Sequence, residues 1–204
     1  MSALGRKRLL NFPFAAMRRE TDQATWMAAK MPGMGNRLKI RRATRRDAAT
    51  LIAFNGAMAL ETEGKVLMPQ VIGAGVRHLL RHPDSGFYLV AESGGEVIAG
   101  LMITTEWSDW RNGEFWWIQS VYVRAQYRRQ GVYRRLYRFV QALAARKRGV
   151  CGFRLYVERN NRRAQATYRA SGMERTHYLV YEHLKPGVRF FTPAQPRRKK
   201  QRNF

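Results

Sequence analysis

One feature constrains the fold of this chain most: a run of apolar residues that is followed by a charged loop and an amphipathic segment. The segment EFWWIQSVYV (114–123) is almost continuously apolar, β-branched and aromatic, which is typical of a central strand buried on both faces. A short polar loop follows and reaches Gly131. Beyond this glycine, apolar residues recur at helical spacing: Val132, Leu136, Phe139, Val140 and Leu143. The sequence therefore predicts a buried strand, a loop, and a helix whose apolar stripe packs on the sheet.

Strands and helices alternate along the rest of the chain. Thr44 with Asp47 three residues later has the pattern of a capping box, and Pro69 suits the first turn of a helix. Strands are expected at 37–43, 86–92, 96–107, 151–158 and 175–184. Further helices are expected at 45–61, 69–81 and 161–172. The order β-α-α-β-β-β-α-β-α-β predicts an α/β fold, with a mixed, mostly antiparallel central sheet flanked by helices.

Length and cysteine content limit the class of protein. The 204 residues fit one ordinary domain, and no uncharged apolar run approaches the ~18 residues that span a bilayer. A single cysteine, Cys151, cannot form an internal disulfide, which indicates a reducing compartment. No secretory h-region follows Met1, so a cytoplasmic location is expected. The Arg-rich, acid-poor residues 1–19 also resemble an organellar targeting peptide in composition, which leaves the organellar matrix as an alternative.

The net charge of +24 is unusual, and it is spread over the whole chain. The sequence divides into a basic, flexible N-terminal extension (1–36), a folded domain (37–185) and a basic C-terminal tail (186–204). The excess of basic residues in the middle segment shows that the two ends explain only part of the charge. A field of this sign favours polyanionic partners such as RNA, DNA or an acidic membrane surface. It would disfavour polycationic substrates.

The loop before Gly131 has the features of a phosphate site. A helix N-terminus presents unpaired backbone N–H groups and the positive end of the helix dipole, and both attract phosphate. Glycine allows a close approach of the backbone to a ligand. Arg134, Arg135 and Arg138 lie off the apolar stripe, so they are expected on the solvated face of the helix.

A second motif lies beyond the strand expected at 151–158. In VERNNRRAQATYRASGM, Asn161 is followed by Ala164, Tyr168, Gly172 and Met173. This spacing resembles the signature that follows the fifth strand of GNAT-superfamily acetyltransferases. The loop RRQGVY (128–133) resembles the acetyl-CoA motif of the same superfamily, Gln/Arg-x-x-Gly-x-Gly/Ala. The resemblance extends over about residues 38–184 and includes the order of the elements, so it implies the GNAT acyl-CoA N-acyltransferase fold.

The resemblance implies which residues would bind acetyl-CoA. The backbones of Val121 and Val123 would pair with the pantetheine arm, and Asn161 would meet the same region. Backbone N–H groups of the loop would hold the pyrophosphate, with the arginines nearby; the residues concerned are Arg128, Arg129, Gln130, Gly131, Val132 and Tyr133. Tyr133 departs from the family pattern, which has Gly or Ala there, so its side chain is expected to point away from the ligand.

The resemblance also implies a chemistry, in which an amine attacks the thioester directly and the coenzyme A thiolate leaves. Tyr168 occupies the position of the general acid, which protonates the departing sulfur. Related polyamine acetyltransferases have an acidic pair where this chain has Gln119 and Ser120, which argues against a polyamine substrate. The candidate base is therefore Glu106, on the strand next to 114–123. The other carboxylates that could line an acceptor cleft are Glu61, Glu63, Asp109 and Glu114.

Four of the five tryptophans, Trp107, Trp110, Trp116 and Trp117, lie in the same tract. They could line an acceptor pocket or fill the core, and core filling is expected for whichever of Trp116 and Trp117 faces inward.

The resulting expectation is an enzyme, an acetyl-CoA-dependent N-acetyltransferase that acts on a primary amine of a small molecule or a protein. Acetyl-CoA is the expected cosubstrate, and no metal and no membrane partner are expected. The alternative is a GNAT-like RNA- or ribosome-associated binding protein with little or no catalysis. Homodimerisation is common in the superfamily, but the sequence leaves the oligomeric state open, as it does the identity of the acceptor.

Overall fold

The structure is a computed structural model, and it describes residues 38–194. Its strands are β1 (Lys39–Arg42), β2 (Lys65–Leu67), β3 (Phe87–Ser93), β4 (Glu96–Ser108), β5 (Gly113–Val123), β6 (Val150–Arg154) and β7 (Phe191–Pro193). Its α-helices are α2 (Ala48–Glu63), α3 (Pro69–Arg81), α4 (Val132–Arg146) and α5 (Arg162–Arg169). Within residues 38–194, no helix is both long enough and apolar enough to cross a membrane.

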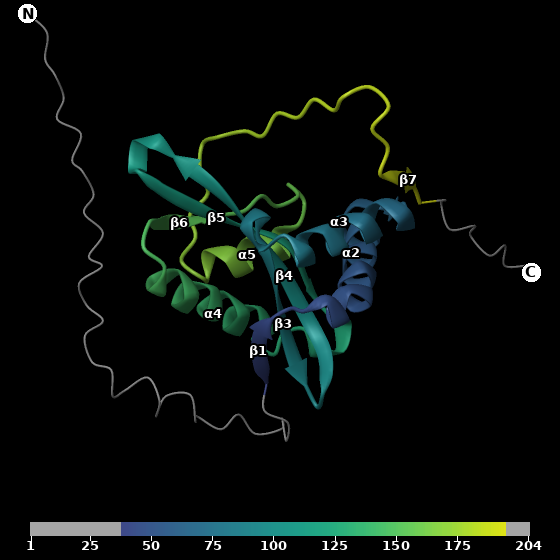
Figure 1. The fold of residues 1–204 in the computed structure, drawn as a ribbon, viewed down its shortest axis with the longest axis horizontal. Helices are drawn as coiled ribbons and strands as arrows, with labels where there is room; N and C mark the ends of the chain where they lie inside the picture. Colours follow the sequence, from purple (N-terminus) through teal and green to yellow (C-terminus); the bar gives the residue numbers. More distant parts are fainter. Residues whose placement is uncertain (1–37, 195–204) are drawn as a thin grey trace, which may run out of the picture. The chain divides into compact units, whose positions relative to one another are not determined.

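The main sheet has five strands in the order β1-β3-β4-β5-β6 (Figure 1). Neighbouring strands are antiparallel except for β5 and β6, which run parallel. A second, two-stranded sheet pairs β2 with β7. This architecture confirms the expected mixed, mostly antiparallel sheet flanked by helices.

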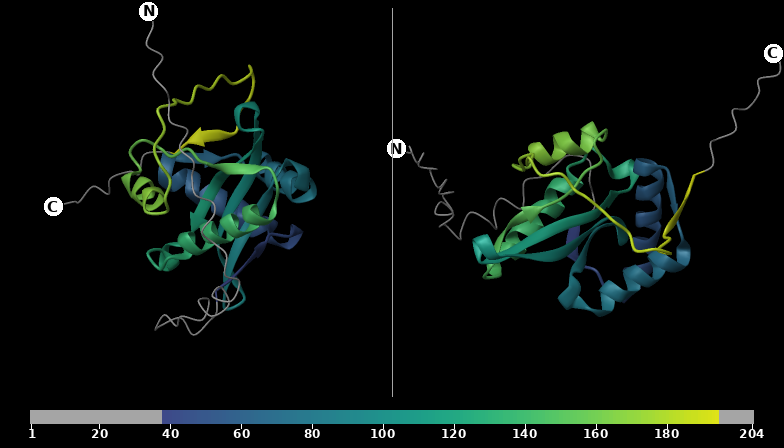
Figure 2. Two further views of the ribbon diagram at one scale, coloured as in Figure 1. Left: turned by 90° about the vertical axis from the view of Figure 1, so that its left-hand side faces the viewer. Right: turned by 90° about the horizontal axis from the view of Figure 1, so that it is seen from above.

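Helix α4 covers one face of the sheet, and α2 and α3 cover the other (Figure 2). A hydrophobic cluster packs on each face. One joins the apolar stripe of α4, including Leu136 and Val140, to Leu89 and Ile103 of the sheet. The other joins α2 and α3 to the opposite side of β3; its buried members are Leu51, Val76, Leu79, Tyr88 and Val90. Because side chains alternate between the faces of a strand, neighbouring residues of β3 enter different clusters. The predicted amphipathic helix after Gly131 is therefore confirmed as the cover of one face.

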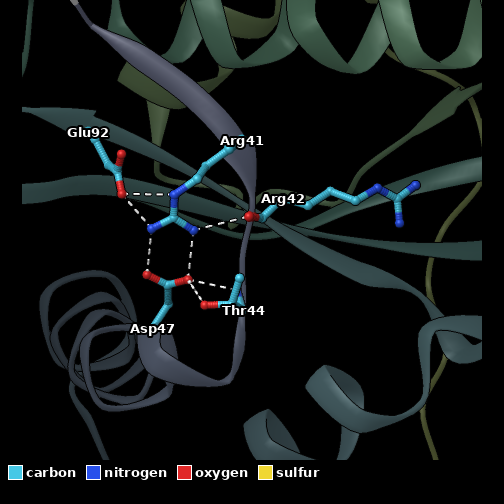
Figure 3. Close-up of polar contacts among 5 residues, drawn as sticks. All are labelled: Arg41, Arg42, Thr44, Asp47 and Glu92. Carbon is cyan, nitrogen blue, oxygen red and sulfur yellow. Dashed lines mark hydrogen bonds and ion pairs between the residues drawn. The ribbon is translucent and has the colours of Figure 1, made fainter.

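An ion-paired corner fixes the start of α2 (Figure 3). The Asp47 carboxylate accepts hydrogen bonds from the Thr44 N–H (2.6 Å) and from the Thr44 hydroxyl (3.1 Å), and the expected capping box is present. Arg41 donates two further bonds to Asp47, at 2.8 and 2.9 Å, and also binds Glu92 of β3 (Nε to Oε1, 2.8 Å). Because only 5% of Asp47 is exposed, this bidentate pair ties β1, β3 and α2 together.

The central strand β5 is not buried on both faces as its composition predicts. Trp116 (2% exposed) and Ile118 (2% exposed) face the α4 cluster, and Trp116 is the inward-facing tryptophan. Trp117 and Gln119 point to the other face and are only half-buried. The α2–α3 cluster includes Met102 of β4 among the side chains packed against it, but no β5 residue. This open half-face is the surface on which the candidate site lies.

The segment 175–184 differs from its prediction as a strand. It has no regular structure, and its apolar side chains are exposed, as at Tyr178 (81%) and Tyr181 (89%). The chain instead crosses toward α2 and forms β7, which pairs with β2 (Figure 1). A sequence rich in strand-forming residues becomes a strand only where a neighbouring strand meets it, and the crossing provides none.

The C-terminal tail therefore begins later than residue 186. Phe191 lies in β7, where its ring contacts Phe190 and the Lys65 ammonium (4.8 Å to the ring centroid). These contacts hold residues that the sequence assigned to a solvated tail. The predicted extension 1–36 lies outside the described residues, as does the part of the tail from 195 onward.

Candidate active site

A β-bulge interrupts the pairing of β4 with β5. Gly100 stands opposite Tyr122 and Met102 opposite Gln119, so two residues of β5 face one of β4. Ser120, in the bulge, has φ +50°, which is the left-handed region. A bulge bends its strand and redirects the residues that follow. The part of β5 beyond the bulge therefore runs in a different direction from the part before it.

The strands β5 and β6 separate just before this bulge. They pair only from Glu114–Val150 to Trp117–Arg154, and the described chain provides no strand partner for that edge of β5 from Ile118 onward. The Arg124 N–H donates to the Ile98 carbonyl of β4 at 3.0 Å. Because successive backbone groups point to opposite sides of a strand, the amides and carbonyls of Val121 and Val123 face away from β4. They line the gap and suit pairing with an extended ligand.

The loop after β5 ends in two left-handed residues, Arg129 (φ +65°) and Gly131 (φ +73°). Gly131 is the N-cap of α4, and the first helical hydrogen bond runs from the Arg135 N–H to the Gly131 carbonyl (3.1 Å). The amides of the first turn therefore have no acceptor within the helix. A left-handed turn that leads into a 15-residue helix forms a backbone site for an anion.

Arg128 is fixed beside this loop. Its Nε donates to the Val123 carbonyl (2.8 Å), and its Nη2 pairs with Glu61 at the end of α2 (2.7 Å). Its guanidinium also lies over the Tyr122 ring, 5.3 Å from the centroid. The Tyr122 hydroxyl donates to the other oxygen of Glu61 (3.2 Å). These contacts hold a cationic side chain at the end of β5, against the end of α2.

The short helix α5 places Tyr168 against the first turn of α4. The Tyr168 ring meets the Tyr133 ring edge-on, with 5.4 Å between centroids. Tyr133 also stacks on Tyr137 (6.1 Å) and packs against the α4 cluster, so it points away from the loop as expected. Burial raises the pKa of Tyr168, so the phenol stays protonated and able to donate a hydrogen bond. Asn161 caps α5 by accepting the Ala164 N–H at 3.0 Å.

The model of the acetyltransferase (GNAT) family matches residues 58–173, more than half of the chain. The chain belongs to the GNAT family of acetyltransferases. No curated protein matches its sequence.

Solved structures agree with this assignment. A possible acetyltransferase from Clostridium difficile 630 is 42% identical, with a TM-score of 0.68 over 72% of this chain and 97% of that one. Aminoglycoside N-acetyltransferase AAC(6')-Iy in complex with CoA is 16% identical, with a TM-score of 0.59 over 76% and 99%. Glucosamine-6-phosphate N-acetyltransferase from Arabidopsis thaliana is 17% identical, with a TM-score of 0.57 over 72% and 99%. The last two show likeness of fold alone.

In this GNAT domain, Glu106 lies on β4 two residues beyond Thr104, on the same face of the strand. It stands opposite Phe115 of β5, and Phe115 lies five residues before Ser120. One of its oxygens accepts the indole N–H of Trp117, and the other binds the guanidinium of Arg154. Both oxygens are thus engaged within the sheet. This placement favours a structural role, and the assignment of Glu106 as the base stays a prediction.

The structure adds a polar group that the sequence analysis did not single out. The Tyr156 hydroxyl, after β6, donates to the Gln119 amide oxygen (3.3 Å), and the Gln119 amide N–H donates to the Thr104 hydroxyl (2.6 Å). Burial raises the pKa of Tyr156, as do the nearby carboxylates of Glu63 and Glu182. The group joins β4 and β5 to the segment that follows β6, beside the bulge. Only the pairing of strands brings these residues together, so no sequence spacing could have indicated them.

The remaining tryptophans and carboxylates of the predicted tract lie elsewhere. Trp107 (62% exposed) and Trp110 (85% exposed) lie toward the end of the β4–β5 hairpin. Glu114 pairs with Lys147 (2.8 Å) and lines a hollow of about 290 Å³ that also includes Phe87 and Trp116. None of the residues expected to bind acetyl-CoA lines this hollow. Within residues 38–194, no group of three His, Cys, Asp or Glu side chains could hold a metal ion.

Proposed function

We propose that this GNAT protein transfers the acetyl group of acetyl-CoA to a primary amine of a small molecule or a protein. The observation that carries the proposal is the open edge of β5 beyond Ser120, which leads directly to the left-handed turn before α4. An extended arm with a pyrophosphate at one end has the shape and charge for this path. The named solved relatives are acetyltransferases, one of them in complex with CoA.

The residues present fit acetyl-CoA. Val121 offers its backbone N–H and carbonyl to the pantetheine amides, and Val123 offers its N–H, since its carbonyl accepts a hydrogen bond from Arg128. The amides of the first turn of α4 and the loop residues 129–131 would hold the pyrophosphate, and Arg128 lies close enough to the turn to add a positive charge. Asn161 would reach the pantetheine region through its amide nitrogen, because its oxygen is used as the cap of α5.

Tyr168 supplies the acid. When the amine attacks the thioester carbonyl, the carbon–sulfur bond breaks and the sulfur keeps the electron pair. Tyr168 donates its proton to that sulfur, as its buried and protonated phenol allows. The attacking nitrogen loses a proton to water, and the polar group of Gln119, Tyr156 and Thr104 beside the bulge can order that water.

The alternative of an RNA- or ribosome-associated protein with little catalysis gains no support from the comparisons, whose named members are acetyltransferases. We therefore propose the enzyme alone. The net charge of +24 remains available for attracting an anionic coenzyme.

Binding of acetyl-CoA to the full-length chain tests the proposal first. Acetyl-CoA at about one hundred times its Kd should stabilise the fold by about 2.7 kcal/mol and raise Tm. Thiol release is then followed with amino sugars, amino acids and peptides that carry a free N-terminus or a lysine. Tyr168→Phe should keep the rise in Tm and lower kcat at least tenfold. Absence of any rise in Tm at millimolar acetyl-CoA would refute the proposal.

A further inference from the structure

Tyr133 has a hydroxyl that the fold leaves without a partner. The oxygen is sealed from solvent and makes no hydrogen bond with any residue in the range 38–194. Buried polar groups in native proteins are almost always paired, because an unpaired one loses its bonds to water without replacement. A hydroxyl of this kind points to a partner that it gains in another state of the protein.

Two phenols, Tyr137 and Tyr168, lie against the Tyr133 ring, and Tyr168 is the one that the proposed reaction deprotonates. Its ring meets the Tyr133 ring edge-on (5.4 Å, 67°), whereas Tyr137 stacks nearly parallel on Tyr133 (6.1 Å, 7°). Burial raises the pKa of Tyr133 well above its ordinary value, and the neighbouring phenol of Tyr168 raises it further. Tyr133 therefore keeps its proton when Tyr168 gives its own away.

We propose that Tyr133 is a positioning residue for Tyr168, and that its hydroxyl donates a hydrogen bond to the Tyr168 oxygen during acetyl transfer. The inference rests on the proposed function, because it needs Tyr168 as the acid. It assigns a role to the residue that departs from the small Gly or Ala of the family pattern.

Tyr168 needs this hydrogen bond because it acquires a negative charge during the reaction. As the carbon–sulfur bond breaks, the sulfur takes the bonding pair and then the Tyr168 proton, which leaves a phenolate at a half-buried position. An ordinary thiol has a pKa of about 8.5 and an ordinary tyrosine about 10, so this transfer runs uphill. Burial raises the pKa of Tyr168 and so makes this proton transfer still less favourable. A donor aimed at the phenolate oxygen stabilises the charge, and Tyr168 later regains a proton from water.

The test compares three variants of the full-length protein with the fastest amine found in the panel. Tyr133→Phe should lower kcat about tenfold, and the KM for acetyl-CoA and its effect on Tm should stay within about twofold. Tyr137→Phe is the matched control, since it removes a phenol that stacks on Tyr133 from the same helix, and it should retain kcat. In a Tyr168→Phe background, Tyr133→Phe should cause no further loss, because Tyr133 acts through Tyr168.

Two results would overturn the inference. One is a Tyr133→Phe variant with unchanged kcat. The other is an equal loss of kcat from Tyr133→Phe with and without Tyr168, which would mean that the ring only supports packing. The Tm of Tyr133→Phe should not fall, because the substitution removes an unpaired hydroxyl. A failure of the proposed function is distinguishable, since the unsubstituted protein would then show no acetyl transfer and Tyr168→Phe no effect.

Discussion

The Glu61 carboxylate at the end of α2 binds the guanidinium of Arg128 at a distance of 2.7 Å. The two residues are far apart in the chain, and their contact joins the helix over one face of the sheet to the loop that precedes α4. Because Arg128 also donates to the Val123 carbonyl, its charge is held beside the edge of β5 where the coenzyme is proposed to lie. The pair therefore connects the two sides of the candidate site.

Replacing Arg128 should weaken binding of acetyl-CoA. Arg128→Met keeps most of the apolar stem but removes the charge, so the Kd for acetyl-CoA should rise about tenfold, as measured by isothermal titration calorimetry. Glu61→Gln is the matched control, because it removes the other half of a half-exposed ion pair of small net energy. Its Kd should stay within about twofold. An equal rise in both variants would show that the ion pair matters and not the charge of Arg128.

The rate should rise with pH in the neutral and weakly alkaline range. A lysine-type primary amine has a pKa of about 10.4, so with such an acceptor the reactive neutral form increases about tenfold with each pH unit below that value. Burial raises the pKa of Tyr168, so the acid stays protonated until the pH exceeds about 10. The plot of log kcat/KM should therefore climb with a slope near one between about pH 7 and 9. A decline within this range would contradict a protonated Tyr168.

The substitution Glu106→Gln tests whether the Glu106 carboxylate has a structural role or acts as the catalytic base. Since both oxygens of Glu106 are engaged, by Trp117 and by Arg154, we expect a lower Tm and a kcat within about threefold of the unsubstituted protein. A base at this position would instead require a loss of kcat of about a hundredfold or more at unchanged Tm. Measuring both quantities on one preparation decides between the two roles.

Asp47→Asn should destabilise the corner between β1, β3 and α2. The substitution leaves Arg41 without its bidentate partner, which should cost about 3 kcal/mol of the free energy of unfolding in urea near pH 7. Glu96→Gln, which breaks the exposed pair with Arg124, should cost less than about 1 kcal/mol. Similar losses of the free energy of unfolding in both variants would show that the buried ion pair contributes no more to stability than the exposed one.

The ion pairs of the same corner should make the free energy of unfolding depend on pH. The hydrogen bonds from Arg41, followed by those from Thr44, hold the pKa of Asp47 below its ordinary value. A depressed pKa contributes stability above the unfolded value of about 3.9, and this contribution is lost as the pH falls through the folded value. The difference between the unsubstituted protein and Asp47→Asn should therefore shrink on acidification below about pH 4. A difference that stays constant with pH would contradict this linkage.

The local elements follow from the sequence alone. Pro69 and the pattern after it gave the bounds of α3, and Thr44 with Asp47 gave the start of the 3-10 turn (Arg45–Asp47) that leads into α2. The strand, the loop and the helix after Gly131 were also predictable, because a left-handed N-cap and an apolar stripe are properties of a few neighbouring residues. The motifs around Gly131 and Tyr168 were sufficient to indicate the family.

The tertiary structure decided what neighbouring residues could not. An apolar sequence does not reveal that β5 is only half-buried at Trp117 and Gln119, because burial depends on where α2 and α3 pack. The bulge at Ser120 and the engagement of Glu106 by Trp117 and Arg154 depend on strand register. The segment 175–184 has the composition of a strand and forms none, because hydrogen bonding in a sheet needs a partner that only the fold supplies.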